Sequence, residues 1–221
     1  MTRWILALSA LLLAASPAWG TTLTPPDDFE DGTVMDWAYA VASQLTNAAS
    51  GGPAGVGDHW LRLETDGISN PGGRPVVTNG AQWSGDYIAN NVHSVAADFA
   101  NFGSEDLHIR FAIQGAGGER YVSTASFLLA ADGAWQNLEF SLEAANFSQV
   151  TGGSATFADV LADVERIRFL SRELDAGWNG DEIATILGID NITSMPEPGT
   201  LVLLGAGLAA LAHGRRRSRT A

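Results

Sequence analysis

Two tryptophans stand beside polar residues at spacings suited to sugar binding. Trp60 is followed by Arg62 and Glu64, and Trp135 is followed by Asn137. Sugar rings present flat C–H faces that stack on aromatic rings, while neighbouring polar side chains bind the hydroxyl groups. If both segments are strands, alternation places these residues together on outward faces. We therefore predict a glycan-binding surface at Trp60 and Trp135. The alternative is that both rings are buried by a bulge or a second layer.

Residue types found in hydrolytic sites occur in the chain, but their spacing does not build such a site. Glu64 and Asp66 are a carboxylate pair of the kind that glycosidases use, yet an acidic chain contains such pairs by chance. His59, His93 and His108 are isolated, and the sequence has no HExxH, GxSxG or phosphate-binding GxxxxGK[ST] motif. We therefore predict no catalytic residues, and a glycan-active hydrolase or lyase is the third interpretation.

Charge is distributed unevenly along the 221 residues. Between residues 21 and 194 there are seven arginines, no lysine and 24 of the 25 acidic residues, which gives a formal charge of −17. Such a body repels the phosphates of nucleic acids and anionic lipid surfaces, so we expect no nucleic-acid partner. The absence of cysteine excludes disulfides and thiolate metal sites. A chain of this length suits one ordinary domain with processing segments.

Residues 27–193 contain short runs that alternate apolar and polar residues, separated by turns rich in glycine. These runs place the following residues on inward faces: Leu61 and Leu63; Val95, Ala97 and Phe99; Leu107, Ile109, Phe111 and Ile113; Leu138, Phe140 and Leu142; Ile167 and Phe169. Arg166 and Arg168 face outward. Further strands are predicted at Phe29 and at 34–38, 121–129 and 186–192, with one short helix in 156–167, and Trp37 is expected in the core. The pattern predicts an all-β fold, an antiparallel β-sandwich.

The N-terminus has the composition of a secretory signal peptide. Residues 1–20 carry Arg3, then an apolar run, and end in the small-x-small box Ala18-Trp19-Gly20. The apolar run is shorter than the ~20 residues that a spanning helix needs, which argues against an uncleaved anchor. We expect the mature chain to start near Thr21.

The C-terminus combines three features in order. A Pro-Glu-Pro-Gly-Thr step at 196–200 leads into an apolar run to Ala212, and a basic cluster follows. The residues concerned are Pro196, Glu197 and Pro198, then Arg215, Arg216 and Arg217. The prolines forbid a helix through the junction and favour the extended form that a processing enzyme binds. In this order the features resemble the PEP-CTERM sorting signal of bacterial exported proteins.

That resemblance implies recognition by a membrane-embedded exosortase and cleavage at or near the motif. The apolar run and the arginines would then be a hydrophobic sorting helix and a basic stop in the inner membrane. Delivery to the cell surface or extracellular matrix would follow. We accordingly expect a signal peptide at 1–20, a sandwich domain at 21–194 and a sorting signal at 195–221. A linker to a permanent anchor is the alternative.

The opening DDFEDG at 27–32, the RIRFLS strand at 166–171 and the closing GIDNI at 188–192 resemble the galactose-binding-like jelly roll of many carbohydrate-binding modules. Members of that family commonly hold a structural calcium ion, so the resemblance implies Asp28, Glu30 and Asp190 as its ligands. Calcium prefers oxygen ligands such as carboxylates. An EF-hand is excluded because no glutamate stands at the twelfth position. A solvated acidic turn is the alternative.

Together these features predict an exported, non-enzymatic protein that is processed at its C-terminal signal and acts at the surface or in the matrix. A carbohydrate-binding module with an extracellular polysaccharide as its ligand is the alternative.

Overall fold

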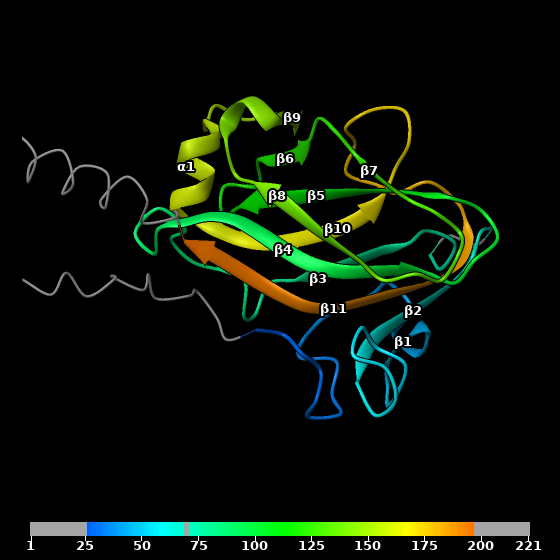
Figure 1. Cartoon of the computed structure of the whole chain (residues 1–221). Coiled ribbons are helices and arrows are strands. Elements are labelled where there is room, and N and C mark those ends of the chain that lie inside the picture. Colours follow the sequence, from blue (N-terminus) through cyan, green and yellow to red (C-terminus); the bar gives the residue numbers. More distant parts are fainter. Residues whose placement is uncertain (1–25, 69–70, 197–221) are drawn as a thin grey trace, which may run out of the picture. The chain divides into compact units, whose positions relative to one another are not determined.

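The computed structural model describes residues 26–68 and 71–196, which form two antiparallel sheets (Figure 1). The strands are β1 (Leu45–Ala48), β2 (Trp60–Asp66), β3 (Val76–Asn79), β4 (Val92–Asn101), β5 (Leu107–Gly115), β6 (Arg120–Ser123), β7 (Phe127–Leu129), β8 (Gln136–Ser141), β9 (Phe147–Thr151), β10 (Val164–Ser171) and β11 (Ala184–Pro196). The helical elements are α1 (Phe157–Ala162) and the 3-10 turns η1 (Ala42–Gln44) and η2 (Ala144–Asn146). Within the described ranges, no helix is long and apolar enough to cross a membrane.

One sheet has five strands in the order β1-β2-β11-β4-β8. The other has six strands, with β3-β10-β5-β6-β9 in order and β7 paired with β5. The chain therefore passes repeatedly between the two sheets, and β11 returns to the centre of the five-stranded sheet between β2 and β4. This arrangement confirms the predicted all-β antiparallel sandwich.

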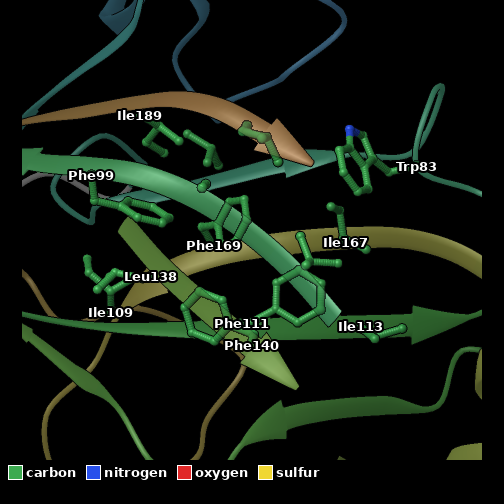
Figure 2. Packing of buried hydrophobic residues seen from close by; sticks show 14 of the residues in the cluster. Trp83, Phe99, Ile109, Phe111, Ile113, Leu138, Phe140, Ile167, Phe169 and Ile189 are labelled. Atoms are coloured by element: carbon green, nitrogen blue, oxygen red, sulfur yellow. The ribbon is translucent and has the colours of Figure 1, made fainter. Parts of the chain in front are cut away.

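The two sheets pack face to face through a cluster of phenylalanines (Figure 2). The ring centroid of Phe169 on β10 lies 5.1 Å from that of Phe99 on β4 and 5.3 Å from that of Phe111 on β5. Phe111 in turn stacks on Phe140 of β8 at 5.6 Å. All four side chains are buried. Because full burial of one such side chain stabilises the fold by about 1.5–3 kcal/mol, this cluster is a main source of cohesion between the sheets.

The inward positions predicted for the main strands are all buried, as is Trp37. The predicted helix is also confirmed as α1. It begins with a capping box, in which the Asp159 N–H donates to Thr156 Oγ1 and the Thr156 N–H donates to Asp159 Oδ2. Two orphan backbone donors at the start of the helix are thereby satisfied.

Several weaker strand predictions are wrong or incomplete. Phe29 and residues 34–38 form no strand, because Phe29, Met35 and Asp36 have left-handed backbone angles with φ between 47° and 59° that an extended strand excludes. Ala38 forms only an isolated bridge with Thr78. Residues 121–129 form two strands, β6 and β7, which pair with different parts of β5. Strands β1, β3 and β9 were not predicted, since each has only four or five residues and little alternation.

The acidic opening of the domain lies against its last strand. The Asp27 N–H donates to the carbonyl of Ile192 at 3.0 Å, and the Ile192 N–H donates to the carbonyl of Asp27 at 3.1 Å. The last strand continues to Pro196, the residue at which the sorting motif starts. The signal peptide, the apolar run and the C-terminal arginines lie outside the described residues, so the boundaries at 20 and 195 stay predictions.

Candidate functional site

Asp27 ties the acidic opening to the core. Its Oδ2 accepts hydrogen bonds from the indole N–H groups of Trp37 at 2.7 Å and Trp83 at 2.8 Å. Burial raises the pKa of this carboxyl group, an effect that the two indole bonds oppose. Asp27 was not identified from the sequence, because nothing in the local pattern distinguishes it from its neighbours Asp28 and Glu30. Its role is structural.

The predicted calcium ligands do not all come together. Asp28 is exposed and accepts a hydrogen bond from the Glu30 N–H at 3.2 Å. Glu30 accepts from the His59 N–H at 2.9 Å and lies near enough to Asp190 for its charge to act there. Asp190 is 1% exposed, and burial, followed by the charges of Asp58, Asp98 and Glu30, raises its pKa to about 7.

The ranges 26–68 and 71–196 contain no group of three acidic or histidine side chains arranged to hold a metal ion. Two of the three predicted ligands, Glu30 and Asp190, share one acidic neighbourhood with Asp58, whereas the charge of Asp28 acts on Asp27. The donor set of the resemblance therefore fits this chain poorly. Calcium binding stays a prediction.

The predicted glycan-binding tryptophans form a closed aromatic cluster on the outer face of the five-stranded sheet. The ring of Trp60 lies 5.7 Å from that of Trp135 and 5.3 Å from that of Phe102. Both indole N–H groups bind backbone carbonyls of the loop at Ser50 and Gly51. The expected exposure of Trp60 is wrong, because the loop covers it and leaves 7% exposed. Trp135 is half-buried. Neither indole has a donor left for a ligand.

Arginine is segregated in this acidic body. Of the seven arginines between residues 21 and 194, only Arg62 belongs to the five-stranded sheet. The other six lie in the six-stranded sheet or directly beside its strands: Arg74, Arg110, Arg120, Arg166, Arg168 and Arg172. Arg166 and Arg168 point outward as predicted, because their neighbours Ile167 and Phe169 fill the core. We call this outer surface the arginine face.

Two of these arginines fix the loop that follows β10. Arg110 is 3% exposed and donates to four backbone carbonyls, among them those of Arg172 at 2.8 Å and Glu173 at 3.1 Å. The Arg172 guanidinium binds Asp175 within the loop. The loop is thereby held against the sheet, and it carries Trp178 to the arginine face.

Trp178 lies between two arginines that come from different strands. The guanidinium carbon of Arg168 is 4.1 Å from the centre of the Trp178 ring, and that of Arg120 is 4.6 Å away. Arg168 also donates to the Trp178 carbonyl at 2.9 Å and to Thr78 Oγ1 at 3.1 Å. Cation–π contacts of this kind contribute about 0.5–2 kcal/mol each and orient both partners.

The indole N–H of Trp178 differs from the others in the described part of the chain. Those of Trp37, Trp60, Trp83 and Trp135 each bind an acceptor of the protein. Trp178 is half-buried, and its indole N–H forms no hydrogen bond within residues 26–68 and 71–196. Its donor is therefore available to a ligand.

An open pocket of about 370 Å³ adjoins this cluster over β3 and β10. Its polar lining consists of Tyr39, Arg74, Thr78, Arg166, Arg168 and Asn179. Arg74 pairs with Glu182 at 2.9 Å and Arg166 pairs with Glu165. The Nε atoms of both arginines are buried, and they lack an acceptor in the described ranges. A buried donor without an acceptor costs about 1–3 kcal/mol.

The electrostatics of the pocket favour a negative or strongly polar ligand. Neither Arg120 nor Arg168 forms an ion pair within the described parts of the chain. Burial lowers the pKa of Arg168 to about 10, with smaller contributions from the charges of Arg120 and Arg166. Arg168 still carries its charge at neutral pH, next to two other cations. Sequence reasoning did not find this site, because its arginines come from segments far apart in the chain.

Comparison with solved structures supports the fold. The chain is similar to an exo-beta-agarase, with a TM-score of 0.56 and 14% sequence identity over 78% of this chain and 25% of that one. It is also similar to an agarase, AgWH50C, with a TM-score of 0.52 and 12% identity over 80% and 27%. The chain thus spans about a quarter of the length of these agarases.

A family 11 carbohydrate-binding module of the cellulosomal cellulase Lic26A-Cel5E of Clostridium thermocellum matches over 78% of this chain and 95% of its own, with 14% identity and a TM-score of 0.49. At these identities the likenesses to the two agarases concern the fold alone. No curated protein matches the sequence.

The family model for the PEP-CTERM protein-sorting motif matches residues 196–217. This range holds the Pro-Glu-Pro step, the apolar run and the three consecutive arginines. The motif indicates that the protein is exported. The chain therefore consists of an all-β sandwich followed by a PEP-CTERM sorting motif.

Proposed function

We propose that this exported protein binds an extracellular glycan on the arginine face and does not catalyse a reaction there. The observation that carries the proposal is Trp178, whose ring contacts the guanidinium groups of Arg120 and Arg168, while its indole N–H forms no hydrogen bond within the described residues. Planar side chains with fixed donors at the edge of an open pocket suit the hydroxyl and ring oxygens of a sugar.

Export and processing complete the proposal. The sorting motif supports an exosortase-type enzyme as the processing partner and the cell surface or extracellular matrix as the destination. Polysaccharides are the ligands that a surface protein meets there. The agarases share only the fold with this chain, so the choice of a glycan rests on the site. It replaces the first interpretation, a matrix component without a defined ligand.

The test is affinity electrophoresis of the full-length protein in a sugar-free non-ionic detergent, in gels with and without polysaccharide. The panel contains agarose, xyloglucan, polygalacturonate and alginate. We expect at least one polymer to retard the protein, Trp178→Ala to abolish the retardation, and Trp135→Ala to leave it unchanged. Trp135 is the matched control, since it too is a half-buried tryptophan on an outer face.

Two results would overturn the proposal. If no polymer retards the protein, the interpretation as a matrix component without a glycan ligand is restored. If Trp135→Ala abolishes binding while Trp178→Ala does not, the ligand belongs to the cluster of Trp60 and Trp135. Circular dichroism of both variants shows whether each one is folded.

A further inference from the structure

We infer that the glycan bound at the arginine face is anionic, and that Arg74, Arg166 and Arg168 receive its carboxylate or sulfate groups. This inference rests on the proposed function and names the ligand class of the same site. A neutral sugar would need donors in the pocket, but it would not need three guanidinium groups.

The first argument is the distribution of charge. The body carries a formal charge of −17, so its overall field repels a polyanion, and only a local site can bind one. Arg110 and Arg172 are used to hold the loop after β10. Arg74 and Arg168 also contact this loop, through Glu182 and the Trp178 carbonyl, but together with Arg166 their side chains line the pocket.

The second argument is that the cations around the pocket and Trp178 are only partly neutralised. Glu182 pairs with Arg74, and Glu165 pairs with Arg166. Gln114 links Glu165 to Arg120, since it donates to the carboxylate at 2.6 Å and accepts from Arg120 Nε at 2.9 Å. This link orders Arg120 without giving it a carboxylate of its own.

The register of the sheet keeps the cations close together. Arg166 on β10 is paired with Gln114 on β5, which is paired with Arg120 on β6. Arg168 lies two residues further along β10 on the same face and is paired across the sheet with Thr78 of β3. Like charges so arranged repel one another, and a bound anion removes that repulsion.

The third argument is geometric. Guanidinium groups present planar forks of donors that match carboxylate and sulfate oxygens, with two parallel hydrogen bonds to one group. Side chains of Arg74 and Arg166 are 33% and 39% exposed, so both can be reached from the solvent. The pocket volume of about 370 Å³ falls within the range of small-ligand sites. The site thus has room for a charged sugar unit of a longer chain.

Isothermal titration calorimetry with matched polymers tests the inference. One pair is polygalacturonate and its methyl ester, and the other is carrageenan and agarose, so that carboxylate and sulfate are examined separately against a neutral backbone. We expect one anionic polymer to bind at least about tenfold more tightly than its neutral counterpart, with an affinity that falls as sodium chloride is raised. The pair whose anionic polymer binds shows whether the protein recognises carboxylate or sulfate groups.

Three variants separate a local site from general attraction. Arg74→Gln and Arg166→Gln should each weaken binding of the anionic polymer by about tenfold, as expected for the loss of a charge-assisted hydrogen bond. Arg62→Gln is the control, because it makes the same charge change on the opposite sheet, where Arg62 pairs with Glu64. Its affinity should equal that of the unmodified protein.

The outcomes distinguish this inference from the proposed function. Equal binding of the charged and neutral polymers, still lost in Trp178→Ala, would refute the anionic ligand and keep the glycan site. Weakening by Arg62→Gln as large as that by Arg166→Gln would also refute it. Absence of binding to every polymer would remove both proposals.

Discussion

Replacement of Asp190 by asparagine should stabilise the protein at high pH and leave its stability unchanged at low pH. Asp190 lies on β11 and is 1% exposed, and its Oδ1 accepts the Asn191 N–H at 2.7 Å. A β-carbon added at Gly52 would stand 3.2 Å from Asp190 Oδ2 and 2.5 Å from Asp58 Oδ2, so the two carboxylates face the same small space. Asparagine keeps the size and the acceptor but removes the charge.

The magnitude follows from the pKa of Asp190. Burial raises the pKa from 3.8 to about 7 in the folded protein. The protonated form is therefore favoured by folding, and its stabilising contribution is complete below pH 4. It is lost as the pH rises from about 4 to 7, because the unfolded chain releases the proton more readily. With 1.36 kcal/mol for each tenfold change in acidity, the loss is at most about 4 kcal/mol.

Urea denaturation of the full-length protein and of Asp190→Asn at pH 4.5, 6 and 8 checks this reasoning. The variant should be more stable than the unmodified protein by only about 1 kcal/mol at pH 4.5 and by about 4 kcal/mol at pH 8. An unchanged difference across this pH range would contradict the explanation based on buried charge. Added calcium chloride at pH 8 is a further arm: the calcium prediction requires it to stabilise the unmodified protein and not the variant.

Three further substitutions test the packing. Phe169→Ala should lower the free energy of unfolding in urea by about 3–5 kcal/mol, since it opens a cavity between the sheets. A loss below about 1 kcal/mol would contradict the placement of Phe169 in the core. Gly188→Val places a β-carbon 2.8 Å from Trp135 Cη2, so quenching of tryptophan fluorescence by acrylamide should increase, and unchanged quenching would refute the contact. Thr156→Ala removes the capping box with Asp159 and should cost about 1 kcal/mol in the same urea assay, whereas no loss would mean that the cap is not needed.

The sandwich could be predicted because the face of a strand that packs into the core carries an apolar residue at every second position. Leu107, Ile109, Phe111 and Ile113 show it most clearly, and all four are fully buried. The strand predictions for segments without this alternation were wrong. Phe29 is as buried as these residues, but it sits in a turn with a positive φ, and hydrophobicity alone does not distinguish a buried turn from a strand.

The candidate site on the arginine face could not be predicted from the alternation of apolar and polar residues alone. The pattern placed Trp60 on an outward face, and it is there, but the loop at Ser50 and Gly51 covers it. It also placed Arg166 and Arg168 outward, which is correct. The pattern could not show that the loop after β10 folds back over the sheet and brings Trp178 into contact with Arg168 and Arg120. Contacts between distant segments depend on strand order, and strand order is set by the whole fold.

The meeting of β11 with the sorting motif has a consequence for export. The motif match starts at residue 196, and the last paired residues of β11 are Met195, opposite Ser94, and Pro196, opposite Val92. The last strand of the domain and the sorting motif therefore share residue 196, and no linker separates the end of β11 from the start of the motif. If the protein is cleaved at or near the motif, as proposed above, the end of β11 would have to separate from β4 before an enzyme could bind several extended residues there. Pro196 has no N–H to donate to β4, so this strand end would separate more readily than one with a complete set of hydrogen bonds, and cleavage would be coupled to that separation.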